Sequence, residues 1–226
     1  PDDFENLDAL RKFIFDSIAA YRINKGRGVI AQFNRDNFDE YLTFTRIGSG
    51  SLGGKARGLA FLDSLVKRNN LTFKYPGVVI RIPKTLVLTT EIFDDFMEEN
   101  DLYKTALSDI SDEEILEQFL AAKIPNRIQE DLSSFIEVVK NPLAVRSSSL
   151  LEDSHYQPFA GIYSTYMVPC NNDNNEEKIT VLCNSIKAVY ASVFYKASKA
   201  YMNAISQVID EEKMAIVLQE VCGKNH

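Results

Sequence analysis

The sequence predicts an α/β fold of the mixed α+β kind, in which helices and strands share one layered domain. Apolar residues recur at helical spacing in several segments, and short apolar or alternating segments typical of strands lie between them. Of the 226 residues, 45% are hydrophobic and 25% are charged, so the chain can bury a sizeable core. Such a mixture of elements packs as layers around that core.

The first third of the chain is expected to lead from a helix into a strand and a second helix. Apolar spacing predicts a helix over residues 5–24, and we assign residues 1–40 to a helical connecting segment. The domain proper is assigned to residues 41–226 and is expected to open with a strand at 41–47. A glycine-rich segment, 48–54, then precedes a helix that carries apolar residues at helical spacing.

The remaining elements follow from periodicity and from start and stop signals. Thr90 is a candidate helix cap, Ser111 to Glu114 form a capping-box pattern, and Pro142 ends a later helix. Strands are expected at 78–82, 85–88, 143–145, 162–168 and 214–221, and a long helix at 176–206.

Charge and cysteine content exclude several classes of protein. The net charge of -7 argues against a general nucleic-acid binder, although an acidic chain can still hold an anion locally. Three sparse cysteines predict free thiols in a reducing, cytoplasmic compartment, and neither a disulfide framework nor a zinc site. No apolar run reaches the roughly 18 residues that cross a bilayer. Because the N-terminus begins with Pro1 and lacks both an initiator Met and a signal-type apolar core, we expect this sequence to be part of a longer chain.

The glycine-rich segment is the first candidate site. Gly48-x-Gly50-x-x-Gly53 matches a dinucleotide-binding pattern, but the acidic residue expected about 20 positions later is missing. Ala56 stands where a Walker P-loop needs Ser or Thr. Small residues before a helix N-terminus, with Lys55 at the junction, still suit a phosphate. A glycine-rich turn with a solvated lysine is an equally good interpretation of the pattern.

Three further segments could contact a ligand. An apolar strand delivers Arg146 and Ser147, which suit an oxyanion, although Arg146 could instead pair with Glu152 or Asp153 in a surface turn. Gly161 precedes a strand on which Thr165 would share a face with Tyr163, and by itself this is a half-buried strand. The last strand ends in Gln219, Glu220 and Val221, which could read an adenine edge or simply leave the core.

Taken in order, these segments resemble the N-terminal nucleotide-binding domain shared by pyruvate phosphate dikinase, phosphoenolpyruvate synthase and rifampin phosphotransferase. The resemblance spans roughly residues 45–222. It is carried by Leu52-Gly53-Gly54-Lys55-Ala56-Arg57-Gly58-Leu59, Ile82-Pro83, Leu86–Thr90, Ala144-Val145-Arg146-Ser147-Ser148-Ser149-x-x-Glu152-Asp153, Phe159-Ala160-Gly161-x-x-x-Thr165 and Val217-Leu218-Gln219-Glu220-Val221.

The resemblance implies an ATP-grasp-like nucleotide-binding subdomain, with ATP held between two subdomains. It places Gly53 and Gly54 in the phosphate loop, and Lys55, Arg146 and Ser147 on the phosphates, with Lys55 and Arg146 contributing to catalysis. For the rest of the nucleotide, the resemblance implies that Gly161 and Thr165 line the phosphate or ribose side of the cleft. It also implies that Gln219 hydrogen-bonds adenine and that Glu220 and Val221 form the hinge along the adenine edge. Related enzymes split ATP into AMP and phosphate and pass the β-phosphoryl group to a histidine on a separate domain.

The chain ends soon after this hinge, so we expect it to be the first subdomain only. The Mg²⁺ ligands, the phosphohistidine domain and the acceptor domain would lie downstream, and the 226-residue chain alone should transfer no phosphoryl group. The acceptor could be pyruvate, an antibiotic or a glucan, or the domain could sense nucleotide without turnover. An open half-cleft also predicts uncovered apolar surface, through which a homodimer could form.

Overall fold

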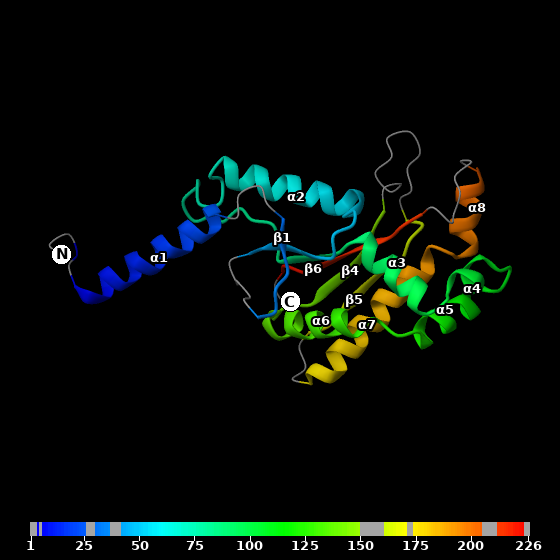
Figure 1. The fold of residues 1–226 in the computed structure, drawn as a ribbon. Coiled ribbons are helices and arrows are strands. Elements are labelled where there is room, and N and C mark those ends of the chain that lie inside the picture. The colour runs from blue at the N-terminus through cyan, green and yellow to red at the C-terminus, as the bar shows by residue number, and fades with distance from the viewer. Residues whose placement is uncertain are drawn as a thin grey trace.

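One mixed sheet forms the centre of the domain (Figure 1). The computed structural model describes residues 4, 6–25, 30–36, 42–149, 161–170, 174–204 and 212–223. The six-stranded sheet has the order β1-β2-β3-β6-β4-β5. Its strands are β1 (Ala31–Gln32), β2 (Phe44–Ile47), β3 (Thr85–Leu88), β4 (Leu143–Ser148), β5 (Thr165–Val168) and β6 (Ala215–Glu220).

The pairing of the strands places the two halves of the candidate site side by side. β1, β2 and β3 pair in parallel, whereas β6 runs antiparallel to both β3 and β4, and β5 runs antiparallel to β4. The last strand of the chain therefore lies in the middle of the sheet, between the strand that follows the glycine-rich helix and the strand that carries Arg146.

Helices cover the two faces of the sheet unequally (Figure 1). Among the described helices, α2 alone lies over one face, where Ala56 of α2 and Leu52, which precedes it, share a small buried cluster with Val87 and Val217. The larger core lies on the opposite face, beneath the helices α3 to α7. The helices are α1 (Leu7–Lys25), α2 (Gly53–Arg68), α3 (Thr90–Glu99), α4 (Tyr103–Leu107), α5 (Asp112–Ala121), α6 (Asn126–Val138), α7 (Asn175–Ser192) and α8 (Lys196–Ala204).

The predicted α/β class is confirmed, but two predicted elements are wrong. Residues 78–82 form no strand, because they make only an isolated bridge between Tyr75 and Val78 and one backbone hydrogen bond from Ile80 to Thr72, join no sheet and remain largely exposed. Apolar, β-branched sequence does not make a strand without a neighbour to pack against. The predicted long helix is also interrupted, since α7 ends at Ser192 and α8 begins at Lys196.

Buried polar groups stabilise that interruption. The Ser198 hydroxyl donates to the Ser192 carbonyl at 2.7 Å, and both residues are buried. The Lys196 N–H donates to the Asp112 carboxylate at 2.8 Å. Side-chain groups thus replace the helical hydrogen bonds at the break, a possibility that apolar periodicity cannot reveal.

Other element boundaries shift by a few residues. The strand expected at 41–47 is observed at Phe44–Ile47, and the one expected at 162–168 at Thr165–Val168. β4 runs on through Arg146 to Ser148, which places the basic residue within the sheet. Thr89, not Thr90, is the residue that precedes α3, and its side chain makes no capping hydrogen bond.

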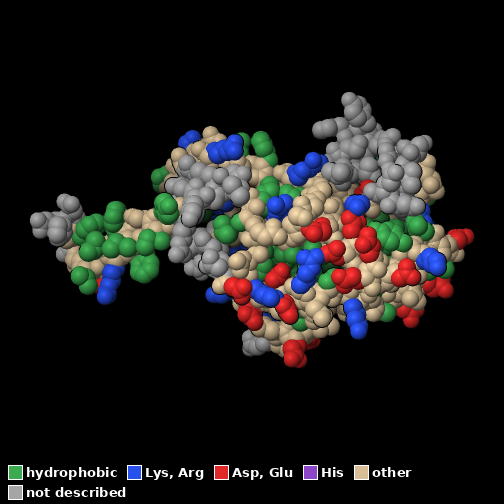
Figure 2. Space-filling model, viewed as in Figure 1, with side chains coloured by type: hydrophobic (Ala, Val, Ile, Leu, Met, Phe, Trp, Pro, Cys, Tyr) green, Lys and Arg blue, Asp and Glu red, His purple; other side chains and the backbone are tan. Residues whose placement is uncertain are grey.

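The N-terminal connecting segment contributes to the packed domain. β1 pairs with β2, and Phe33 is buried in the main core, so the packed body begins before residue 41. α1 extends away from that body and carries hydrophobic side chains, which Figures 1 and 2 show. On α1, Leu7, Phe13 and Phe15 are exposed. In the described part of the chain, no helix combines the length and apolarity required to cross a membrane.

The predicted capping box at the start of α5 is confirmed and gives a stability test. The Ser111 hydroxyl accepts from the Glu114 N–H, and the Glu114 carboxylate accepts from the Ser111 N–H. We expect Ser111→Ala to lower the free energy of unfolding by about 1 kcal/mol, because the helix loses its N-terminal cap. Urea denaturation measures this change. Ser134→Ala, at a half-buried position of α6 where the hydroxyl bonds only to the Glu130 carbonyl of the same helix, is the control and should change it by less than about 0.5 kcal/mol.

Candidate functional site

The first turn of α2 meets the end of β4, which brings two of the sequence-predicted residues together. The Lys55 ammonium lies 3.2 Å from both the carbonyl and the hydroxyl oxygen of Ser147 and donates to them. These residues are 92 positions apart in the sequence. Ser147 is only 1% exposed, so its hydroxyl is held in the protein interior. A cation is therefore fixed where the strand that carries Arg146 ends.

Gly53 makes this approach of α2 to β4 possible. It has φ +70°, and a Cβ atom there would lie 1.6 Å from the Ser148 carbonyl oxygen. The Gly54 N–H donates to the Ser149 carbonyl at 2.9 Å. The buried Ser148 hydroxyl accepts from the Ala56 N–H at 3.0 Å and donates to the Leu52 carbonyl at 2.8 Å. Gly53 thus allows α2 and β4 to pack closely, and the Ser148 hydroxyl is occupied by hydrogen bonds within the protein.

The other two glycines of the pattern pack against the start of α3. A Cβ atom on Gly50 would lie 2.7 Å from both the Glu91 nitrogen and the Thr90 hydroxyl oxygen. A Cβ atom on Gly48, where φ is +91°, would lie 2.2 Å from the Thr89 hydroxyl oxygen. The dinucleotide-like spacing is therefore explained by close packing of Gly48 and Gly50 on the start of α3 and of Gly53 on β4, and it does not require a dinucleotide.

Glu91, in the first turn of α3, holds this loop in place, a role that could not be predicted from the sequence. Its carboxylate accepts from the backbone N–H of Ser49 and, at 2.7 Å, from the Ser49 hydroxyl. The Thr90 hydroxyl accepts from the Ser51 N–H at 3.0 Å. Nothing in the residue pattern indicates that the start of α3 would hold a loop some 40 residues earlier, because only the parallel β2–β3 pair brings them together.

We predict that the Glu91 carboxylate makes a pH-dependent contribution to the stability of the fold. Donation from the Ser49 backbone N–H and hydroxyl lowers the pKa of Glu91 below its usual value. A depressed carboxyl pKa stabilises the fold above the unfolded-state pKa, and this contribution is lost as pH falls through the folded-state pKa. We expect Glu91→Gln to be less stable than the unmodified chain at pH 7, and this difference to shrink as pH falls through the depressed folded-state pKa of Glu91, below its usual value of about 4.3.

Urea denaturation at several pH values measures the Glu91 effect. Glu99→Gln, at the exposed end of the same helix, is the matched control and should change stability by less than about 0.5 kcal/mol. A stability difference between Glu91→Gln and the unmodified chain that stays constant from pH 7 to pH 3 would contradict this role of the carboxylate.

Arg146 and Thr165 lie on the sheet face that α2 covers only in part. Val217, Arg146 and Thr165 are directly paired across β6, β4 and β5, and paired residues point to the same face. Val217 packs beneath α2, whereas Arg146 is half-buried and Thr165 is exposed. Arg146 makes no hydrogen bond or ion pair with any described residue, and Glu152 and Asp153 lie outside the described residues. A free guanidinium thus borders the open part of this face.

A second row of paired residues continues the same face. Gln219 pairs with Thr85 on one side and Ala144 on the other, and Ala144 pairs with Met167. The Gln219 side-chain nitrogen donates to the Thr85 hydroxyl at 3.2 Å. Met167 is 65% exposed, so the row ends in uncovered apolar surface at the edge strand. The face therefore offers an apolar floor beside Gln219 and a cation at Arg146.

The backbone at the predicted hinge is already hydrogen-bonded. The Glu220 N–H donates to the Lys84 carbonyl at 2.9 Å, and the Val221 N–H donates to the Pro142 carbonyl at 2.8 Å. An adenine bound here would therefore have to form its hydrogen bonds with groups other than these two N–H donors. The Gln219 amide, which is half-buried on the open face, is one such group.

The remaining predicted residues are less closely connected to Lys55. Gly161 is exposed with φ +81°, and a Cβ atom there would touch nothing within 4 Å. Thr165 was predicted to share a strand face with Tyr163. β5 begins at Thr165, so Tyr163 lies before the strand and is buried in the main core, whereas Thr165 is exposed. Residues 150–160, including Phe159, Ala160 and His155, lie outside the described residues. Within the described residues, no three His, Cys, Asp or Glu side chains group as metal ligands.

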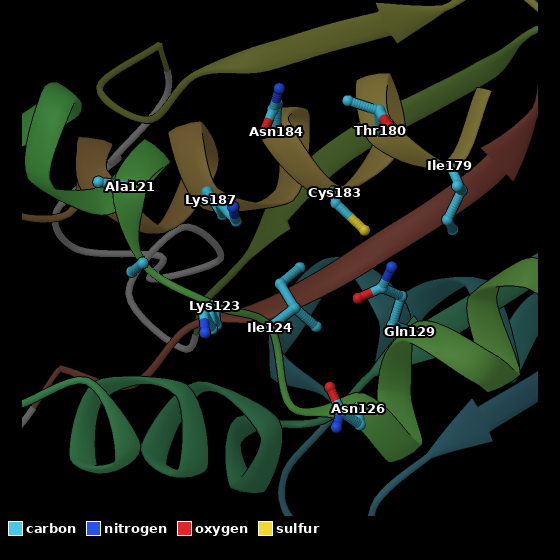
Figure 3. Close-up of a pocket in the computed structure, with 11 residues that line it drawn as sticks. Ala121, Lys123, Ile124, Asn126, Gln129, Ile179, Thr180, Cys183, Asn184 and Lys187 are labelled. Atoms are coloured by element: carbon cyan, nitrogen blue, oxygen red, sulfur yellow. The ribbon is translucent and has the colours of Figure 1, made fainter. Parts of the chain in front are cut away.

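A pocket of about 280 Å³ lies elsewhere, between α7 and the segment that joins α5 to α6 (Figure 3). Its lining includes Lys123, Asn126 and Gln129 on one side and Cys183 and Lys187 on the other. None of the sequence-predicted site residues lines it. α7 packs on the sheet face that α2 does not cover, so this pocket and the Lys55–Arg146 region are separate.

Comparison with known proteins shows the family of this domain. Residues 49–226 match the family model described as pyruvate phosphate dikinase, AMP/ATP-binding domain. A Bacillus subtilis (strain 168) protein named uncharacterized phosphotransferase YvkC is 29% identical over 141 residues, which are 61% of this chain and 15% of that protein. The chain thus spans less than a fifth of that relative. The matched region contains the α2–β4 junction and all strands from β3 onward, and the chain belongs to the pyruvate phosphate dikinase AMP/ATP-binding domain family.

Proposed function

We propose that the open sheet face beside α2 binds ATP, and that this domain supplies the nucleotide site of a phosphotransferase. The observation that carries the proposal is that two cations come to the end of β4, because Lys55 contacts Ser147, the residue next to Arg146. Lys55 is fixed against Ser147, and the neighbouring Arg146 keeps a guanidinium that no described residue engages. Charge-assisted donors of this kind bind phosphate oxygens strongly, and Arg can do so with two parallel hydrogen bonds.

The chemistry of the face supports a nucleotide oriented along it. The phosphates would contact Lys55, Arg146 and the first turn of α2, where the helix N-terminus also favours an anion. Thr165, exposed directly beside Arg146, would donate a hydroxyl hydrogen bond on the phosphate or ribose side. The base would lie over Ala144 and Met167, within reach of the Gln219 amide. Gly161, Glu220 and Val221 stay predictions as nucleotide contacts.

The proposed reaction is the transfer of the β-phosphoryl group of ATP to a histidine and then to pyruvate, giving phosphoenolpyruvate. AMP would leave, and water would accept the γ-phosphoryl group to give inorganic phosphate. Mg²⁺, held by acidic residues of a second subdomain, would offset phosphate charge when bound. In this chain, Lys55 and Arg146 would hold and neutralise the phosphates, and the buried Ser147 would position Lys55. We also propose a cytoplasmic location, which suits the three free cysteines.

An acceptor assay on a longer form of the protein tests this proposal. With ATP and Mg²⁺, we expect AMP formation to depend on pyruvate. AMP formation with an antibiotic or a glucan but not with pyruvate would keep the ATP site and change the acceptor. Tight ATP binding with no AMP under any acceptor would instead indicate a nucleotide-sensing domain and overturn the proposed transfer.

A further inference from the structure

The pocket between α7 and the α5–α6 segment combines features that suit a small anion. Lys123 and Lys187 line it together with the amide side chains of Asn126, Gln129 and Asn184. Among the described residues that line it, none is Asp or Glu, although the whole chain carries a net charge of -7. This local excess of cations contrasts with the acidic side chains that Figure 2 shows over the neighbouring helical layer.

The floor of the pocket is an uncharged, buried thiol. Cys183 is 8% exposed, and Figure 3 shows its sulfur pointing from α7 across the gap toward the Ile124 and Gln129 side. Burial raises the pKa of the Cys183 thiol to about 11, so the floor stays neutral at physiological pH. Cys183 makes no hydrogen bond with a described residue. A ligand atom could therefore lie against the sulfur without meeting negative charge.

The donors around the mouth of the pocket remain available to a ligand. The Lys187 ammonium donates one hydrogen bond to the Leu120 carbonyl at 3.0 Å, which fixes its position and leaves two further N–H donors. The amide side chains of Asn126, Gln129 and Asn184 make no hydrogen bond with a described residue. Pro125, which precedes α6, supplies no side-chain cap to that helix.

We propose that this pocket binds a small organic or inorganic oxyanion, carrying carboxylate or phosphate groups, as a second ligand site of the domain. Its volume of about 280 Å³ lies at the low end for small-molecule sites, which suits a compact metabolite better than a nucleotide. The inference does not depend on the proposed ATP site, because the two lie on opposite faces of the sheet.

Titration of the ¹⁵N-labelled chain with sodium phosphate and with sodium malonate tests the proposal, with sodium chloride at equal ionic strength as reference. We expect saturable shifts of the Asn126, Gln129 and Lys187 amide signals with phosphate or malonate, and none with chloride. The anion that binds more tightly identifies the chemical class. The absence of saturable shifts with both anions would overturn the proposal.

Two variants locate the binding. Lys123→Met with Lys187→Met should weaken binding at least about tenfold, since each removes a charge-assisted donor. Lys104→Met, an exposed lysine on α4, is the control and should leave binding unchanged. Equal binding by the double variant would overturn the site.

A second measurement keeps both lysines and therefore does not depend on whether the double variant folds. In a Cys222→Ser background, saturating anion should slow alkylation of Cys183 by iodoacetamide at least about threefold, because the ligand would cover the sulfur. Equal alkylation rates with and without the anion would also overturn the proposal.

Discussion

Replacing Lys55 or Arg146 with alanine is expected to lower phosphoryl transfer about 10²–10³-fold in a form of the protein that turns over ATP. Each change removes a positive charge that would stabilise phosphate oxygens in the transition state. Lys55 is held by two hydrogen-bond acceptors on Ser147, so its charge is fixed before any ligand arrives. Such preorganisation is the main reason why a single donor can have so large an effect.

The control for both changes is Arg57→Ala, on the exposed side of the same helix. It removes one positive charge within two residues of Lys55, and we expect the rate to change less than about twofold, because surface charges in water interact weakly. Steady-state kinetics with ATP measures all three variants. Rates of Lys55→Ala and Arg146→Ala that equal the rate of Arg57→Ala would refute the assignment of the site.

Gly53→Ala is expected to lower the free energy of unfolding by roughly 3–5 kcal/mol, a large part of the stability of an ordinary domain. The new methyl group would lie 1.6 Å from the Ser148 carbonyl oxygen, and the backbone at φ +70° disfavours any side chain. Either β4 or the start of α2 would have to move. Because this contact also positions Lys55, we expect nucleotide affinity to fall with stability.

Gly58→Ala is the matched control, five residues further along α2. A Cβ atom at Gly58 meets nothing within 4 Å, so this change should raise the free energy of unfolding by about 0.5–1 kcal/mol through helix propensity. Urea denaturation compares both variants. Equal effects of the two substitutions would contradict the close packing of Gly53 on Ser148.

The fold class followed from periodicity, whereas the environment of some segments did not. Residues 85–88 and 78–82 are similarly apolar, yet only the former find neighbours on both sides, in β2 and β6. The break between α7 and α8 depends on Ser198 at the start of α8 and on Asp112, which reaches it from α5, 84 residues earlier. These outcomes depend on tertiary contacts, which a local pattern does not contain.

The charged and hydroxyl residues of the candidate site could be predicted from the sequence, but the contacts that hold its loops in place could not. Lys55, Arg146 and Ser147 were identifiable because basic and hydroxyl residues stood at the ends of apolar segments. The roles of the glycines were not, because a glycine that contacts Ser148 and one that contacts a phosphate have the same sequence signal. Glu91 gave no signal at all, since its partner Ser49 becomes close only when β2 and β3 pair.

The central claim is that ATP phosphates bind where α2 meets β4. The most direct test is a titration of the ¹⁵N-labelled protein, in a form that extends through the second subdomain, with ATP and Mg²⁺. We predict saturable shifts of the amide signals of Gly53, Lys55 and Arg146, and at least about tenfold weaker binding by Arg146→Ala. Saturable ATP binding that leaves these amide signals unchanged, with equal affinity in the variant, would contradict the account.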